Sequence, residues 1–278
     1  MPSWNIHIAQ TERLFQRGGA VARTVVDRNA FLFGSLIPDI YVGYMTPAIR
    51  EPIPYRITHF ATPSHIPKPR EGEFWDTYVA PAAERLGVRP GGCAVSEADR
   101  IPAASLRVEQ DYVSRSHYPQ RYEDAEPPVW QAVSADDDVS PAALERSLFD
   151  LLLGTWSHLM ADNLWNTRVN EFLDAHGGKP SEEFRIKKQG DFDLFGKALP
   201  LDLIPRATPR LIATVRAFPQ YEIDEQAILT TIGVAHETVR TNHGDENPRY
   251  RLLTSDFFEH VFAENLDAAD EAVAKRLP

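Results

Sequence analysis

The chain has very little cysteine, with Cys93 as the single thiol among 278 residues. One thiol excludes an internal disulfide and a zinc site built from cysteines, and it fits a reducing compartment. Long apolar runs are also missing, since no stretch reaches the roughly 18 residues that a membrane-spanning helix needs. The first residues, "MPSWNIHIAQTERLF", carry polar and charged side chains where a signal peptide needs an apolar core. We therefore expect a soluble, cytoplasmic protein without a transmembrane segment.

Positive charge is scarce as well. Lysine and arginine number 29 against 40 acidic residues, which gives a formal net charge of −11. Nucleic-acid affinity depends largely on clustered basic side chains, so this balance argues against a nucleic-acid partner. The sequence contains no P-loop, no G-x-G-x-x-G and no G-x-S-x-G, so neither a nucleotide fold nor a serine hydrolase is supported.

Helical periodicity dominates what is present. Strand-like alternation is rare, so we predict an all-α fold, a helical bundle with long proline-rich loops. Hydrophobic residues make up 43% of the chain, enough for one domain spanning 1–278, with an irregular insertion at about 87–140. The proline-rich stretch 46–72 should be irregular. The main helices are predicted at 4–17, capped by Ser3, at 141–176, capped by Ser140, and at about 223–241 and 255–276.

The predicted central helix contains the stretch "WSHLMADNLWN", which places a histidine and an aspartate four residues apart. Side chains at i and i+4 lie one above the other on a helix, so His158 and Asp162 can converge on one metal ion. A buried hydrogen bond between the two side chains is the simpler interpretation of this pair alone.

Three further residues favour the metal-site interpretation over the simple hydrogen bond. His7 lies on the semi-apolar face of the first helix, Asp39 follows "LIP" at a turn, and His59 lies in the proline-rich stretch. Each alone is more often structural. Together with His158 and Asp162 they provide three imidazoles and two carboxylates, a ligand set that suits zinc or a related divalent ion.

Four short motifs occur in an order typical of one family. "MPSWNIHIA", "NAFLFGSLIPDI", "THF" and "WSHLMADNLWN" resemble the W-x-x-H, G-x-x-x-P-D, H-F and H-x-x-x-D motifs of the bacterial zinc-dependent phospholipase C-like family, and "DFDLFGKAL" resembles a segment of cytosolic relatives. The resemblance covers roughly 1–205. It implies a helical bundle with central metals, in which Asp39, His59, His158 and Asp162 form one site. His7 and Asp162 would serve a neighbouring site, so Asp162 would bridge two metals.

The chain departs from the family pattern at two places. Secreted members use the amine of an N-terminal tryptophan as a ligand, but Trp4 is internal and is expected to be a packing residue. The trinuclear form also needs a histidine shortly after H-x-x-x-D, where this chain has Asn166 and Arg168. We therefore expect one or two Zn²⁺ ions, with Mn²⁺ or Fe as alternatives.

Additional ligands are sought further along the chain. "HVFAE" offers His260 and Glu264 at i, i+4 spacing, although a solvated pair is the simpler interpretation. His236 has apolar neighbours, and Arg240, one turn later, could face a phosphate. Asp191 could assist the metal, but helix capping is its default role.

A centre of this kind indicates a metal-dependent hydrolase of a phosphoric ester, in which a metal-activated water is the nucleophile. Asp39 or Asp162 would accept the proton of that water. The expected partner is a small-molecule phosphoester or another metabolite. Two alternatives stay open: a metalloenzyme acting on a different bond, and a non-catalytic pseudoenzyme or interaction protein with a structural His/Asp site.

Overall fold

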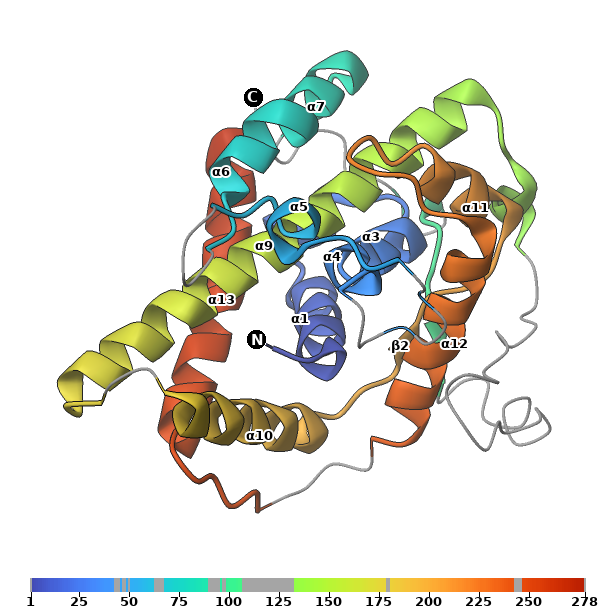
Figure 1. Ribbon diagram of the computed structural model, residues 1–278. Helices are drawn as coiled ribbons and strands as arrows, with labels where there is room; N and C mark the ends of the chain where they lie inside the picture. The colour runs from blue at the N-terminus through green and yellow to red at the C-terminus, as the bar shows by residue number, and fades with distance from the viewer. Residues whose placement is uncertain are drawn as a thin grey trace.

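The computed structural model describes residues 2–42, 46, 49, 51–62, 68–89, 96, 99–106, 133–178, 181–242 and 247–277. These parts are mostly helical, which confirms the all-α prediction (Figure 1). Their only named strands are β1 (Ala104–Ser105) and β2 (Leu203–Ile204), which pair antiparallel with Ala104 opposite Ile204. Within the same residues, no helix combines the length and apolar character needed to cross a bilayer.

The helices of the N-terminal half are mostly short. In chain order they are α1 (Trp4–Arg17), α2 (Ala20–Thr24), α3 (Arg28–Gly34), α4 (Ile37–Ile40), α5 (Tyr55–Thr58), α6 (Glu71–Phe74), the π-helical turn η1 (Trp75–Val79) and α7 (Ala80–Leu86).

The C-terminal half holds the long helices, after the short 3-10 turn η4 (Ser134–Asp137). The helices are α9 (Pro141–Ala175), α10 (Glu182–Ala198), the shorter α11 (Pro209–Arg216), α12 (Glu225–Arg240) and α13 (Ser255–Arg276).

Helix α9 is the centre of the bundle. It has 35 residues and runs diagonally across Figure 1, with α3 and α4 beside it and α13 crossing it. Its middle is buried all round, from Phe149 to Asp162, which is the signature of a helix enclosed by others. Every polar side chain in this middle part therefore needs a partner inside the protein.

Two glycines let α3 approach α9 closely. A Cβ atom on Gly34 would lie 2.1 Å from the carbonyl oxygen of Leu151, and one on Gly154 would lie 2.1 Å from the carbonyl oxygen of Phe31. Both distances are far inside van der Waals contact, so only glycine fits at this crossing. The hydroxyl of Thr155 donates to the Gly34 carbonyl at 3.1 Å and fixes the register of the two helices.

Helix α10 is attached to α9 by aromatic packing. The Trp165 ring on α9 contacts Phe192 and Phe195 of α10 at centroid distances of 5.2 and 6.2 Å. The same tryptophan contacts Phe258 of α13 at 5.9 Å. These residues belong to a hydrophobic cluster of their own, next to the larger one around α3 and α9.

The main helix boundaries agree with the sequence prediction, but the capping does not. Gly18 and Gly177 adopt left-handed backbone conformations just after α1 and α9, as helix-ending glycines do. Ser3 and Ser140, however, make no side-chain cap hydrogen bond. Ser3 faces α10 instead, because a Cβ on Gly196 would lie 2.8 Å from its hydroxyl.

The predicted irregular regions are only partly described. Within 46–72 the chain forms the short helix α5 and an isolated bridge between Ala61 and Pro69, so this stretch is less irregular than predicted. Of the predicted insertion at 87–140, the stretches 90–95, 97–98 and 107–132 lie outside the described residues.

Candidate metal centre

Five residues from four separate segments meet inside the bundle. His7 comes from α1, Asp39 from α4, His59 from the residue that ends α5, and His158 and Asp162 from α9. All five are buried, with exposed fractions between 0% and 5%. We call this group the His/Asp centre. The structure brings together every residue of the main predicted ligand set.

The backbone carbonyl of Ser35 orients the His158 ring through its Nδ1 atom. The Nδ1 atom lies 2.8 Å from the carbonyl oxygen of Ser35, directly after the Gly34 crossing. A carbonyl only accepts, so Nδ1 carries the proton, and a neutral His158 then presents a bare lone pair at Nε2. Such a bond to the outer nitrogen is the usual support of a metal-ligating histidine.

His59 is oriented in the same way. Thr58 Oγ1 donates to the Tyr55 carbonyl at 3.4 Å and lies 2.8 Å from His59 Nδ1. The hydroxyl proton is therefore used, so the hydroxyl oxygen accepts from Nδ1 and leaves a lone pair at Nε2. The next residue, Phe60, has φ 50°, a left-handed conformation that costs a non-glycine residue about 1 kcal/mol. Such strain is common at functional sites, and here the Phe60 ring is held 5.9 Å from that of Phe74.

Four pairs of ligand atoms have the spacing found around a tetrahedral ion. His59 Nε2 lies 3.3 Å from His158 Nε2 and 3.4 Å from both Asp39 Oδ1 and Asp162 Oδ2. His158 Nε2 lies 3.6 Å from Asp162 Oδ2. Zinc bonds of about 2.0–2.2 Å in tetrahedral geometry place neighbouring ligand atoms about 3.3–3.6 Å apart. These four distances fall within that range.

A second group of ligand atoms adjoins the first. His7, His158 and Asp162 each offer an atom within 4.8 Å of the others, as do Asp39, His59 and His158. His7 Nε2 lies 3.6 Å from Asp162 Oδ1, whereas Asp162 Oδ2 faces His59 and His158. The two carboxylate oxygens thus face different imidazoles, an arrangement that suits a bridging ligand.

Polar atoms of this centre are left without hydrogen bonds. Both ring nitrogens of His7 and Oδ1 of Asp162 are fully buried and have no hydrogen-bond partner. The His7 ring stacks on His158 at 3.8 Å with an interplanar angle of 16°, so packing holds it in place. Buried polar atoms without partners are costly, and a bound ion is one of the recognised explanations.

The charges of the centre do not balance. Burial lowers the pKa of both His7 and His59, so these imidazoles are neutral at pH 7. Burial acts to raise the pKa of Asp162, but His158 outweighs it and holds that pKa well below its usual range. Burial also acts to raise the pKa of Asp39, but the neighbouring His59 and His158 outweigh it, so Asp39 is ionised as well. Even with His158 protonated, two negative charges face one positive charge.

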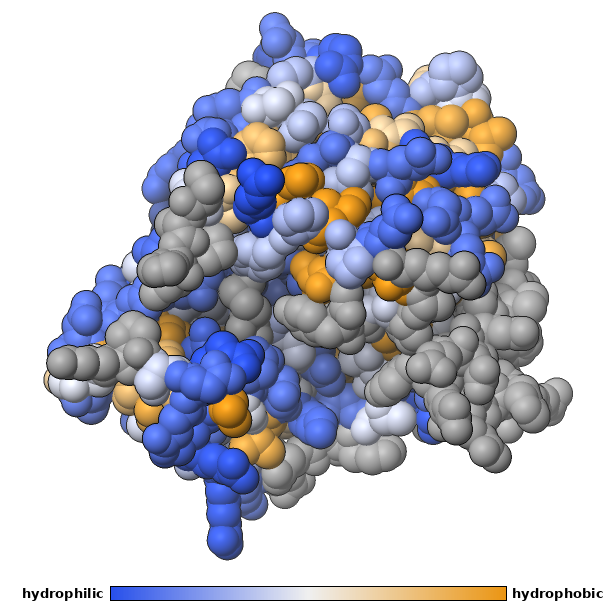
Figure 2. All heavy atoms as spheres, in the orientation of Figure 1, coloured by the Kyte–Doolittle hydropathy of each residue, from blue (hydrophilic) through white to orange (hydrophobic). Residues whose placement is uncertain are grey.

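Tyr55 also belongs to this site, although the sequence did not single it out. Its ring stacks on His59 at 3.8 Å, and its hydroxyl donates to Asp162 Oδ2 at 3.4 Å. The i, i+4 spacing of Tyr55 and His59 after a helix-starting proline was the available signal. Helix α5 lies toward the solvent, since Ile57 is 39% exposed, and Figure 2 shows apolar atoms on this part of the surface.

Asp191 has a structural role. It lies in the middle of α10, and its carboxylate accepts the backbone N–H groups of Arg251, Leu252 and Leu253 at 2.7, 2.8 and 2.9 Å. This arrangement holds the segment before α13 in place. The expectation that Asp191 caps its own helix is therefore wrong, and its oxygens are engaged away from the His/Asp centre.

His260 and Glu264 form no metal site in the structure. His260 is exposed on α13, and Glu264 forms an ion pair and hydrogen bonds with Arg168 of α9. Arg168, which stands where a further ligand was sought, is thus part of a partly exposed ion pair.

His236 and Arg240 lie together on α12. His236 is buried and its Nδ1 lies 3.6 Å from Glu237 Oε1, while Arg240 binds the same Glu237 carboxylate through Nε at 3.1 Å. Neither His236 nor His260 joins a group of close ligand atoms in the described part of the chain.

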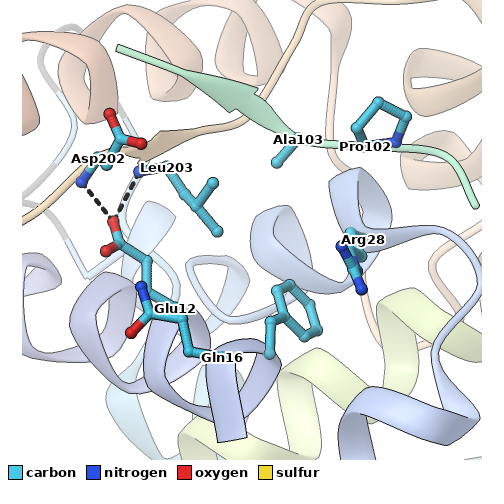
Figure 3. Close-up of a pocket in the computed structure, with 8 residues that line it drawn as sticks. Glu12, Gln16, Arg28, Pro102, Ala103, Asp202 and Leu203 are labelled. Carbon is cyan, nitrogen blue, oxygen red and sulfur yellow. Dashed lines mark hydrogen bonds between the residues drawn. The ribbon is translucent and has the colours of Figure 1, made fainter. Parts of the chain in front are cut away.

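A surface cavity lies apart from the centre. It encloses about 290 Å³ and is lined by residues of α1, α3 and the β1–β2 region, including Glu12, Arg28 and Asp202 (Figure 3). Glu12 Oε1 accepts the backbone N–H groups of Asp202 and Leu203 at 2.5 and 2.6 Å, as the dashed lines show. This carboxylate attaches the β2 segment to α1, and no residue of the His/Asp centre lines the cavity.

Comparison with known proteins adds no relative. No protein-family model, no curated protein and no solved structure matches the chain. The zinc-dependent phospholipase C-like resemblance therefore rests on the short sequence motifs.

Proposed function

We propose that the His/Asp centre binds one or two divalent ions, Zn²⁺ in the first place, and that the protein hydrolyses a phosphoric ester there. The observation that carries the proposal is the pair of Nε2 atoms of His59 and His158, only 3.3 Å apart. Their Nδ1 protons are engaged elsewhere, so in the neutral state two lone pairs face each other. Two lone pairs at this distance repel unless a cation or a proton lies between them.

The distances in the centre support the ligand roles that the family resemblance implies. Asp39, His59, His158 and Asp162 would hold one ion, and His7 with the other oxygen of Asp162 would hold a neighbouring one. Mn²⁺ or Fe would also suit this mixture of imidazole and carboxylate. A divalent ion bound here would make a coordinated water more acidic and withdraw charge from a phosphoryl oxygen.

The chain's own residues would orient the imidazole ligands and deprotonate the attacking water. Ser35 and Thr58 hold the outer nitrogens of His158 and His59, so each Nε2 points inward. Asp39 is 5% exposed and Asp162 is 0% exposed, so Asp39 is the carboxylate that an incoming water can reach. Asp39 would accept the proton of the attacking water, and Asp162 would hold the two halves of the centre together.

A second candidate function is a non-catalytic polar core. One observation supports it: the charge of Asp162 raises the pKa of His158 even though burial acts to lower it. A protonated His158 could donate from Nε2 to His59 or Asp162 and bind the group together without metal.

The experiment that tests the proposal combines metal analysis with turnover. Protein purified without chelator is analysed for Zn, Mn and Fe and assayed on p-nitrophenyl phosphate, bis-p-nitrophenyl phosphate and phosphatidylcholine, before and after EDTA treatment. We expect about one or two zinc ions per chain. We also expect chelator-sensitive turnover of at least one ester, lost in His158→Ala and kept in the control His176→Ala, because His176 is exposed.

Bound metal without turnover of any ester would instead favour a metalloenzyme acting on another bond. Protein without stoichiometric metal, whose stability is unchanged by His158→Ala, would contradict the metal centre itself.

A further inference from the structure

A half-buried lysine lies on the face of α10 that packs on α9. Lys188 is half-buried and lies three and four residues before Asp191 and Phe192, which form the buried face of this helix. Phe192 packs on Trp165, and Trp165 follows Asp162 by one turn of α9. Because residues three or four apart share a helix face, Lys188 lies on the face of α10 that packs on α9, near the turn that carries Asp162.

Three neighbouring cations are engaged in ion pairs. Arg185 pairs with Glu182, Lys187 pairs with Glu183 at 2.6 Å, and Arg168 on α9 pairs with Glu264. Among the residues that the structure describes, Lys188 has no acidic residue within ion-pair distance and no hydrogen bond.

The electrostatic environment of Lys188 agrees with this placement. Burial lowers the pKa of Lys188, and the charge of Asp162 opposes that effect. No other carboxylate compensates its burial to a comparable degree. An ammonium that is partly removed from water without an anion beside it is unfavourable, and a bound anion would relieve that cost.

We propose that Lys188 recognises the phosphoryl group of the substrate by donating to one of its non-bridging oxygens. This inference rests on the proposed function, since it adds a cation from α10 to a centre whose other ligands come from α1, α4, α5 and α9. Lysine is a common phosphate-binding residue that acts as a point charge. The ligand class is thus a phosphoryl anion, and Lys188 determines affinity for it.

The test uses the zinc-loaded protein and inorganic phosphate, measured by titration calorimetry at pH 8. We expect Lys188→Gln to weaken phosphate binding by about tenfold to a hundredfold, which is what loss of one charge-assisted hydrogen bond produces. Lys188→Arg should restore most of the affinity. The matched control is Lys187→Gln on the same helix, whose side chain pairs with Glu183 and should not contribute.

Zinc content is measured in every variant, so the two proposals fail separately. Equal phosphate affinity in Lys188→Gln and wild type, with zinc retained in both, would overturn the role of Lys188 and leave the metal centre standing. Absence of phosphate binding by the zinc-loaded wild type would overturn it too. If the wild type holds no zinc, the proposed function fails, and the same phosphate titration without metal decides on Lys188 alone.

Two further arms identify the source of the phosphoryl group. One uses phenyl phosphate, and the other uses phosphatidylcholine vesicles that contain phosphatidic acid. Weaker binding by Lys188→Gln in either arm supports the proposal, and the arm concerned shows whether the phosphoryl group belongs to a small molecule or to a lipid. Unchanged binding in both arms would contradict it.

Discussion

Two groups of buried charged residues lie along α9 and differ in how their polar atoms are paired. The His/Asp centre occupies the middle of the helix, at His158 and Asp162. The other group lies nearer the start, and we call it the arginine–aspartate network. Its members are Asp27, Asp136, Arg146, Ser147, Asp150, Arg206 and Arg210.

The arginine–aspartate network satisfies its charges internally. Arg206 binds Asp136 through two hydrogen bonds of 2.7 Å, and Asp150 accepts the backbone N–H groups of Val26 and Asp27 at 3.2 and 2.8 Å. Each carboxylate here faces donors. In the His/Asp centre, carboxylate oxygens and imidazole lone pairs face one another instead. The carboxylates of the network thus have donors within the protein, whereas the His/Asp centre has the ligand arrangement of a cation site.

The largest effect should come from breaking the complete network. Arg206→Met leaves Asp136, which is 2% exposed, as a buried charge without its arginine. We expect the free energy of unfolding to fall by about 3–5 kcal/mol, whether or not zinc is present. Urea denaturation measures this, with Arg216→Met as the control, because Arg216 is exposed and belongs to no buried pair. A loss below about 1 kcal/mol would show that the network contributes little.

The next effect concerns the helix crossing that supports the His/Asp centre. Gly154→Ala places a Cβ against the Phe31 carbonyl, so α3 must move. We expect a loss of about 3 kcal/mol and weaker zinc binding, since the Ser35 carbonyl that orients His158 lies next to this crossing. Gly190→Ala is the matched control: it lies in helix α10 with open space around it, and should stabilise the protein by about 0.5–1 kcal/mol. Equal changes in the free energy of unfolding for the two substitutions would contradict the close contact of α3 and α9.

The sequence could predict one part of the His/Asp centre from geometry alone. The spacing of His158 and Asp162 places both on one face of any helix, so their convergence needs no tertiary information. His7, Asp39 and His59 come from separate elements, and only the order of the family motifs indicated that they would meet. The long helices were predictable from periodicity and from the glycines that end them.

Other features depended on contacts that a sequence does not display. Ser35 and Thr58 act through atoms whose role appears only once α3, α5 and α9 are packed. Arg206 and Asp136 are 70 residues apart, and no local pattern links them. Asp191 was misread because its three backbone partners belong to a distant segment. Such contacts join residues that are far apart in the sequence and form only when the chain has folded.

A pH effect of intermediate size is expected from the arginine–aspartate network. Burial raises the pKa of Asp150 to about 6, against the opposing charge of Arg146. The folded state therefore holds this proton more tightly than the unfolded state between about pH 4 and pH 6, and the contribution of Asp150 to stability falls by roughly 2 kcal/mol as the pH rises through that range. Asp150→Asn should remove this fall. Parallel stability–pH curves for Asp150→Asn and wild type would contradict the assignment.

The smallest effect is expected at the outer candidates. Glu264→Gln breaks a partly exposed pair with Arg168, and His260→Ala removes an exposed side chain. Each should change stability by less than about 1 kcal/mol and leave the zinc content unchanged. Elemental analysis and urea denaturation check both. Loss of zinc in either variant would mean that α13 contributes to the metal site.

The central claim, that the His/Asp centre is incomplete without a cation, is tested most directly by one variant under two conditions. The unfolding free energy of Asp162→Asn is compared with wild type, first with EDTA and then with zinc at about a thousandfold above its dissociation constant. We predict that zinc stabilises the wild type by about 4 kcal/mol and does not stabilise the variant. With EDTA the variant should be less stable than the wild type, because the low pKa of Asp162 means that the folded protein favours its charge, but the loss should be smaller than the loss in Arg206→Met. If zinc changes neither protein, and Asp162→Asn destabilises the metal-free protein as strongly as Arg206→Met does, the centre is a polar core like the arginine–aspartate network.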